Sequence, residues 1–189
     1  MIIARGSQAA ARVTARELST AAGWGAGAGL VASVFMAMYA MFAAASYQHT
    51  GFFTPVYHIA SAVLAPDTMM ASMVQATAGH PVTFVLGPAV VGALIHMMVG
   101  AIYGAVFGVL IRLVRAHGLI VPIAGLVWGA IVFAVSAWIG LPIAAAVLGA
   151  GNPIRNMAAL VGYPTFIIEH LIFGATLGVL LMRARFARH

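Results

Sequence analysis

Residues 87–113 read GPAVVGALIHMMVGAIYGAVFGVLIRL, an apolar run whose first charged side chain is Arg112. A helix needs about 20 mostly apolar residues to cross the hydrocarbon core of a bilayer, and this run is long enough. Three further runs of the same kind lie at residues 22–47, 119–148 and 164–182. The sequence therefore predicts an all-α membrane protein with four transmembrane helices.

The composition of the chain supports the same conclusion. Hydrophobic residues make up 63% of the 189 residues and charged residues 6%, whereas soluble proteins carry about 25% charged residues. A surface with so few charges is not kept in water, so the bilayer is the solvent. The net charge of +6 comes from arginines that flank the apolar runs, which favours lipid headgroups over nucleic acid as the partner. The chain has no cysteine, which excludes disulfides and iron–sulfur clusters.

The arginines also predict the orientation of the helices. They gather in a basic lead at residues 1–20, in the link between the second and third apolar runs, and in the C-terminal tail. Arginine-rich ends face the cytoplasm, so we expect both termini inside. Residues 48–86 and 149–163 then form the first and second outer loops, and Arg155 is the arginine that falls outside. Residues 1–189 form a single domain in this interpretation.

The basic lead has two interpretations. Arg5, Arg12 and Arg16 are spaced so that a helix would align them on one face. Such a helix would lie flat on the inner leaflet of the membrane. The alternative is a solvated tail, and the sequence alone leaves both open.

The first outer loop, residues 48–86, is long and not very polar. Two short helices joined at residues 65–67 fit its sequence best, and neither is long enough to cross the membrane. They are expected to lie in the outer interface or to re-enter the bilayer, with Asp67 as the cap of the second helix. The second outer loop contains a turn signal at residues 151–153.

One motif occurs twice in the apolar runs. The pattern H-x-x-x-G-A-x-x-G begins at His96 in the second run and at His170 in the fourth. The first and third runs share a shorter Gly-Leu-Val match that begins at Gly29 and at Gly125. This pattern predicts two helical hairpins related by an axis along the membrane normal, the parallel kind of repeat.

The spacing of the motif predicts how the helices pack. Residues four apart share one face of a helix, and glycine on such a face lets two helix backbones approach closely in lipid. His96 and His170 lie on these faces, so both are expected to point into the bundle, in its outer half. The glycines predicted at packing positions are Gly92, Gly100, Gly104, Gly108, Gly174 and Gly178.

Ionisable residues within a membrane are costly, which makes them candidates for function. Glu169 is the only acid within a predicted span. Together with His96, His170 and His58 it forms the predicted polar site. Two plainer interpretations stay open: Glu169 pairs with Arg155 or a histidine, and the histidines only make hydrogen bonds between helices.

Several functions fit such a site. Paired imidazoles suit haem b, and imidazole with carboxylate suits zinc, copper or iron; the same groups could relay protons. The alternatives are a structural or accessory subunit of a membrane complex, or a small transporter, and we expect a homo-oligomer or a larger assembly. Whether the protein is an enzyme stays undetermined, although the usual nucleotide-binding and hydrolase motifs are absent from the sequence.

A family resemblance adds to this interpretation. The pattern H-x-x-x-G-x-x-Y-G from His96 to Gly104 and the Glu169-His170-x-x-x-Gly174 element resemble those of small uncharacterised bacterial inner-membrane proteins of the YagU type. The resemblance covers about the last hundred residues and rests on glycine-rich helices. It implies a location in the bacterial inner membrane and carries no chemistry with it.

Overall fold

The computed structural model describes residues 13–183, and this part of the chain is helical with no strand. Four of its helical segments are long and apolar enough to cross a membrane, which confirms the predicted all-α class with four spans. Each begins and ends close to its predicted position, except that the first begins earlier. The four segments are α1 (Ala15–Ser46), α4 (Leu86–Leu113), the continuous segment from α5 (Ile120–Val135) to α6 (Leu141–Leu148), and α9 (Tyr163–Arg183).

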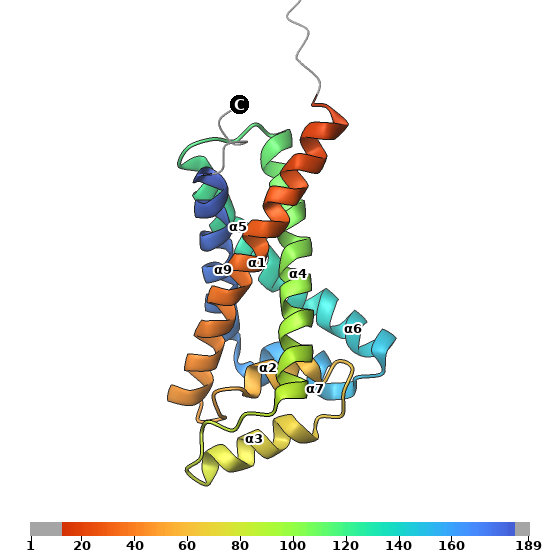
Figure 1. Cartoon of the computed structure of the whole chain (residues 1–189), viewed down its shortest axis with the longest axis vertical. Helices are drawn as coiled ribbons and strands as arrows, with labels where there is room; N and C mark the ends of the chain where they lie inside the picture. The colour runs from red at the N-terminus through yellow and green to blue at the C-terminus, as the bar shows by residue number, and fades with distance from the viewer. Residues whose placement is uncertain (1–12, 184–189) are drawn as a thin grey trace, which may run out of the picture.

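The long helices form a bundle in which α1 packs along both α4 and α9, and α5 packs along α9 (Figure 1). Both ends of the described chain lie at the same end of the bundle as the link between α4 and α5 (Figure 1). The opposite end carries four short helices: α2 (Thr54–Ala60), α3 (Asp67–Thr77), α7 (Gly151–Arg155) and α8 (Met157–Val161). We refer to these as the inner and outer ends, after the predicted orientation.

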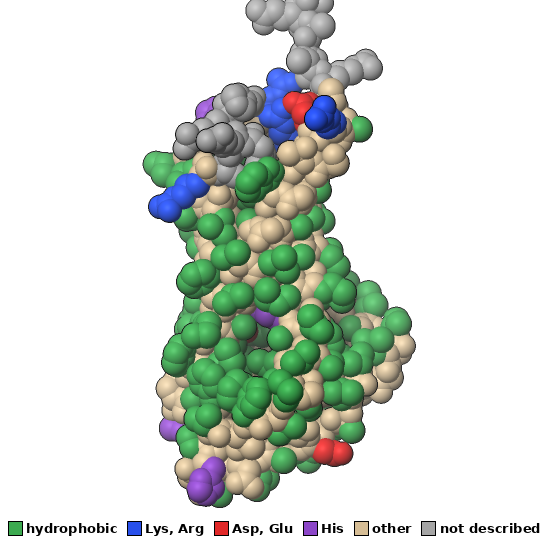
Figure 2. Space-filling view, in the orientation of Figure 1, with side chains coloured by type: hydrophobic (Ala, Val, Ile, Leu, Met, Phe, Trp, Pro, Cys, Tyr) green, Lys and Arg blue, Asp and Glu red, His purple; other side chains and the backbone are tan. Residues whose placement is uncertain are grey.

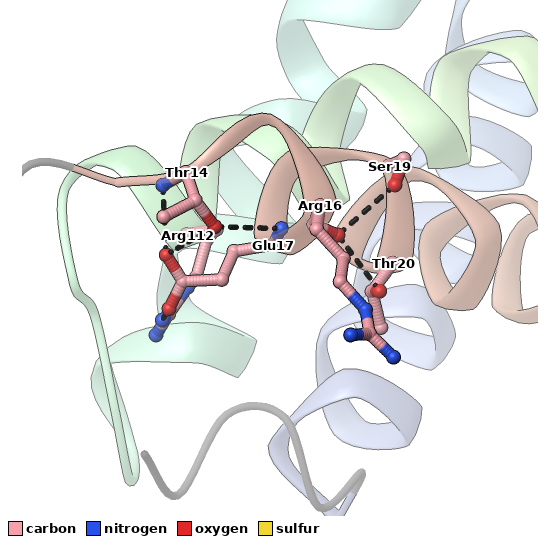
Figure 3. Close-up of polar contacts among 6 residues, drawn as sticks. All are labelled: Thr14, Arg16, Glu17, Ser19, Thr20 and Arg112. Carbon is pink, nitrogen blue, oxygen red and sulfur yellow. Dashed lines mark hydrogen bonds and ion pairs between the residues drawn. The ribbon is translucent and has the colours of Figure 1, made fainter.

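The inner end of α1 begins within the predicted basic lead. Thr14 and Glu17 form a reciprocal capping box there, and Glu17 also pairs with Arg112 at the end of α4 (Figure 3). An acid in a first turn and a base in a last turn both complement the helix dipoles, so this ion pair joins two favourably charged helix ends. Arg5 and Arg12 of the lead lie outside the described residues.

Glycines bring α1 and α4 into direct backbone contact. A Cβ added to Gly25 would collide with the carbonyl oxygen of Gly104. A Cβ added to Gly29 would collide with the carbonyl oxygen of Gly100 and lie 3.1 Å from the Cα of Gly104. No side chain fits at these points, which explains why the residues four apart at the contact are glycines.

The second hairpin repeats this contact in the same alignment. A Cβ added to Gly125 would collide with the carbonyl oxygen of Gly174 and lie 3.0 Å from the Cα of Gly178. Gly100 and Gly174 are equivalent positions of the repeated motif, and Gly29 and Gly125 begin the shared Gly-Leu-Val. The packing of α5 on α9 therefore reproduces that of α1 on α4. Gly92 differs from the other predicted packing glycines, because it contacts the backbone of Val56 in α2.

The relation between the two hairpins is less symmetrical than the hairpins themselves. α1 packs closely on α9, whereas α4 and α5 contact each other at few points. The Trp128 indole lies between them and contacts the rings of Tyr103 and Phe107, at centroid distances of 6.4 Å and 5.9 Å. The inner half is filled by a core of Ala32, Phe107, Ile111, Val121, Phe173, Leu177 and Leu181.

The third span contains a feature that the sequence analysis missed. Residues Ser136–Gly140 form a π-helical turn between α5 and α6, in which the Leu141 N–H bonds to the carbonyl of Ser136. Pro142 follows directly, and a proline inside a helix lacks an N–H and crowds the carbonyl four residues earlier. The wider turn accommodates this crowding. After it, α6 leaves the bundle toward one side (Figure 1).

The first outer loop contains the two predicted short helices. α2 is packed against α4 and α1 at the outer end of the bundle, and its Tyr57 is 2% exposed. α3 lies beyond it as the outermost element (Figure 1). The prediction that Asp67 caps α3 is wrong: the helix begins at Asp67, Pro66 holds the cap position, and no side chain caps it. Asp67 instead lies in the first turn, where a negative charge complements the helix dipole.

The second outer loop is more helical than its turn signal indicated. Gly149 ends α6 with a φ of +66°, a left-handed conformation that favours glycine. Gly151 then begins α7, and Pro153 lies in the first turn of that helix, where a proline is tolerated.

The surface of the described residues matches a membrane environment. Hydrophobic side chains cover the middle of the face in Figure 2, and the blue arginines gather at the inner end. The exposed side chains include Phe35 on α1, Leu94 on α4 and Ile123 on α5. Such a surface is stable against lipid rather than water.

Candidate functional site

The four candidate residues divide between two places. Glu169 and His170 lie on α9, 5% and 4% exposed, and His96 lies half-buried on α4. The imidazoles of His96 and His170 are near enough to interact electrostatically. Figure 2 shows a hollow between α1 and α4 with a histidine side chain inside it. His58 is separate from this group, because it contacts α7 at the outer end.

Each of the two intramembrane histidines uses one ring nitrogen on a backbone carbonyl. His96 Nε2 donates to the carbonyl of Ser33 in α1, at 3.0 Å. His170 Nδ1 donates to the carbonyl of Phe166, one turn earlier in α9, at 2.7 Å. Because a carbonyl only accepts, these nitrogens carry hydrogen in both charge states. In the neutral form the other nitrogen, Nδ1 of His96 and Nε2 of His170, can accept a proton or a hydrogen bond.

Aromatic rings enclose His170. Its ring lies 4.5 Å from that of Phe166 and 6.0 Å from that of Phe133, measured between centroids. Gly129 of α5 lies against the His170 backbone, where a Cβ would collide with the carbonyl oxygen. The His170 side chain is therefore enclosed where α9 packs on α5. The predicted placement of both histidines inside the bundle agrees with the structure.

Glu169 is buried without a polar partner among the described residues. Within residues 13–183 no hydrogen bond or ion pair involves its carboxyl. The ion pair in that part of the chain joins Arg112 to Glu17. The interpretation that Glu169 pairs with Arg155 or a histidine is therefore not supported. Tyr39 on α1 lies near enough to interact with the carboxyl electrostatically.

A chain of hydrogen-bonded hydroxyl groups extends from Tyr39 toward the outer end. Tyr39 and Tyr47 are hydrogen-bonded through their hydroxyls at 3.3 Å, and Tyr47 is bonded to Thr165 Oγ1 at 2.9 Å. The side chain of Gln48 donates to Thr165 Oγ1 and to the carbonyl of Val161. Thr165 lies one turn before Glu169 on the same face of α9.

Sequence reasoning missed these hydroxyl groups. Tyr39 and Tyr47 lie eight residues apart near the outer end of their span, and Thr165 precedes Glu169 by four. These spacings place each pair on one helix face. They do not indicate that the two faces meet, which depends on how α1 packs on α9.

His58 has a role at the outer end of the molecule. Its Nε2 donates to the carbonyl of Pro153 at 2.8 Å, which joins α2 to α7. Burial lowers the pKa of His58, and the hydrogen bond to Pro153 opposes this shift. The side chain is therefore held as a neutral hydrogen-bond donor between the two outer loops.

The arrangement does not form a metal centre among residues 13–183. No group of three or more His, Cys, Asp or Glu side chains in that part of the chain is placed to hold a metal ion. The metal-ion interpretation therefore gains no support from the donor set.

The fold and this site define a multi-pass helical membrane protein with a buried polar cluster. Comparisons with protein-family models, with curated proteins and with solved structures gave no match for this chain.

Proposed function

We propose that the protein binds and passes protons within the outer half of the membrane, with Glu169 as the proton-carrying group. The observation that carries this proposal is the isolation of the Glu169 carboxyl on α9. It is 5% exposed, and no described residue bonds to it or neutralises it. A carboxylate in such a place needs a proton or a cation as its partner.

The hydroxyl chain supplies a route for the proton. Hydroxyl groups both donate and accept hydrogen bonds, so a series of them can pass a proton along. Tyr47 is 56% exposed at the outer end, Tyr39 is partly buried, and Glu169 is buried. The hydrogen-bonded chain therefore extends from the membrane surface to Tyr39, which interacts with the carboxyl electrostatically.

The histidines supply further proton acceptors in the same part of the bundle. His170 directly follows Glu169 in α9, and each imidazole keeps one nitrogen free of the backbone carbonyls. The free nitrogen of a neutral imidazole can accept a hydrogen bond or a proton. We therefore assign His96 and His170 to the relay rather than to a haem or a metal.

The location of the protein belongs to the same proposal. The arginine distribution favours cytoplasmic termini, and the YagU-type resemblance favours a bacterial inner membrane. In that orientation the hydroxyl chain opens to the outside of the cell. The accessory-subunit and transporter interpretations remain predictions.

Infrared spectroscopy of the protein in lipid tests the central group. A pH titration should show the carbonyl stretch of a protonated carboxylic acid appear and disappear, and Glu169→Gln should remove that band. Asp67→Asn on the outer helix α3 is the matched control, because Asp67 lies at the surface end of the molecule. If the titrating band is unchanged in Glu169→Gln, Glu169 does not exchange protons and the proposal is wrong.

The hydroxyl chain is tested separately by the rate at which the Glu169 carboxyl exchanges its proton for deuterium from the medium, read from the shift of the same infrared band. Tyr47→Phe should slow this exchange, because the hydroxyl at the start of the chain is removed. An exchange rate in Tyr47→Phe equal to that of the wild type would contradict a relay.

A further inference from the structure

A cleft at the outer end of the molecule lies apart from the proton site. It has a volume of about 170 Å³ and lies where the π-helical turn, α8 and the start of α9 come together. Its lining includes Trp138 and Pro142 from one side, Arg155 and Asn156 from the second outer loop, and Tyr163 from α9. None of these residues belongs to the cluster around Glu169.

The charge of this cleft is not balanced within the described chain. Arg155 makes no ion pair or hydrogen bond through its side chain within residues 13–183. Of the three acids in the sequence, Glu17 pairs with Arg112 at the other end and Glu169 is buried in the bundle. The third, Asp67, belongs to α3 and does not line the cleft. The cleft therefore presents a guanidinium with no carboxylate beside it.

The polar groups around the guanidinium suit an anion with several oxygens. Arginine binds phosphate oxygens through two parallel N–H donors, and the Asn156 amide adds further donors. α9 begins at Tyr163 on the edge of the cleft, so the positive end of its dipole lies on the same side.

The remaining walls are apolar and include two aromatic side chains. The rings of Trp138 and Tyr163 are stacked at a centroid distance of 6.2 Å and an interplanar angle of 25°, and both side chains are more than 40% exposed. Exposed tryptophan and tyrosine are typical of the membrane–water interface, where lipid headgroups lie. A ligand here meets a cation and an apolar wall together.

From these observations we infer that the cleft binds a phosphate group, held by Arg155 and Asn156. The group could be the phosphodiester of an anionic phospholipid or a free phosphate, and both offer the same oxygens to the guanidinium. The position beside Trp138 and Tyr163 at the interface favours the lipid. This site is independent of the proposed proton relay.

The test uses the full chain in a neutral detergent. Thermal unfolding is followed while short-chain phosphatidylglycerol, short-chain phosphatidylcholine or inorganic phosphate is added. We expect phosphatidylglycerol to raise the unfolding temperature of the wild type. Arg155→Gln should weaken its apparent affinity by about ten-fold or more, as expected for the loss of charged hydrogen bonds. Arg16→Gln is the matched control, because Arg16 is an exposed arginine at the inner end.

Each result has a defined meaning. Stabilisation by the lipid that depends on Arg155 and not on Arg16 supports a lipid site, and stabilisation by inorganic phosphate with the same dependence supports a free-phosphate site. If the two variants respond like the wild type, or lose the response equally, the inference is overturned.

A second variant keeps the test decisive if Arg155→Gln does not fold. Asn156→Ala removes a neighbouring amide and should weaken binding while leaving the charge in place. Trp138 fluorescence, read in a Trp24→Phe, Trp128→Phe background, should shift on lipid binding in the protein with Arg155. An unchanged signal from Trp138, together with full affinity in Asn156→Ala, would place the lipid elsewhere.

Discussion

His58 donates a hydrogen bond to the carbonyl oxygen of Pro153, 2.8 Å away, although the two residues belong to different outer loops. The bond joins α2, which lies against the outer ends of α1 and α4, to α7, which packs on α6. The outer end of the molecule is therefore held together by a contact between segments distant in sequence.

This contact makes the stability of the outer end depend on pH. Burial lowers the pKa of His58, so the folded protein holds this imidazole neutral while the unfolded chain protonates it near its ordinary pKa of about 6.5. The contribution is fully present above that value and is lost as the pH falls below it toward the folded pKa. We expect unfolding in detergent to need less denaturant at about pH 5 than at about pH 7.5.

The variant His58→Gln tests which group is responsible. Glutamine keeps an N–H donor for Pro153 and does not titrate, so part of the pH dependence should disappear. His80→Gln, in an exposed loop, should leave the pH dependence unchanged. A wild-type slope retained in His58→Gln would assign the effect to other groups.

The glycine contacts predict opposite effects on two faces of α1. Gly25→Ala places a methyl group against the carbonyl of Gly104 and should destabilise the protein by about 1–3 kcal/mol, the usual range for overpacking. Gly27→Ala meets nothing within 4 Å and should be neutral or stabilise by up to about 1 kcal/mol. Unfolding of both variants in the same detergent gives the comparison, and equal stabilities of the two variants would mean that the contact with Gly104 does not decide the effect of Gly25→Ala.

The histidine on α4 predicts a difference between two substitutions. His96→Ala removes the donor to Ser33 and should cost about 1 kcal/mol of stability, as is usual for polar contacts between membrane helices. His96→Gln can still donate and should retain most of that stability. If the two variants are equally stable, the bond to Ser33 contributes little to folding.

The orientation is tested with reporter fusions. A reporter placed after Arg115 should be found in the cytoplasm, and one placed near Asn152 should be found outside. The physical reason is the gathering of arginines at the inner end, which resists transfer across the membrane. A cytoplasmic signal at Asn152 would reverse the assignment of the inner and outer ends.

The spans were predictable because membrane helices carry their signal locally. Length and hydropathy indicate where residues 87–113 cross the bilayer without knowledge of any other helix. The glycine motif carried more information, because its spacing predicted which faces of α4 and α9 would pack. The short match at Gly29 and Gly125 was interpreted only as part of the repeat, and the structure shows that these two glycines make equivalent contacts in the two hairpins.

The site was predicted less completely because it depends on contacts between helices. His96, His170 and Glu169 were found as isolated polar groups in apolar runs, but nothing local pairs Tyr47 with Thr165. The prediction that Asp67 caps α3 was wrong for a local reason, because the helix begins one residue earlier than that prediction required. Pro142 is a local signal for an irregularity in the third span, but the sequence analysis did not predict the π-helical turn that precedes it.

Because glycine recurs every fourth residue, the glycine contacts between α1 and α4 do not by themselves fix the alignment of the two helices. If α4 slid by one turn along α1 so that Gly104 lay opposite Gly29 and Gly108 opposite Gly25, glycine would still face glycine, so these contacts alone tolerate a misaligned hairpin. Such a slip would move Arg112 about 5.4 Å away from Glu17 and leave both charges unpaired. An ion pair at a solvent-exposed helix end contributes little to stability, but here it distinguishes the correct hairpin from the slipped one.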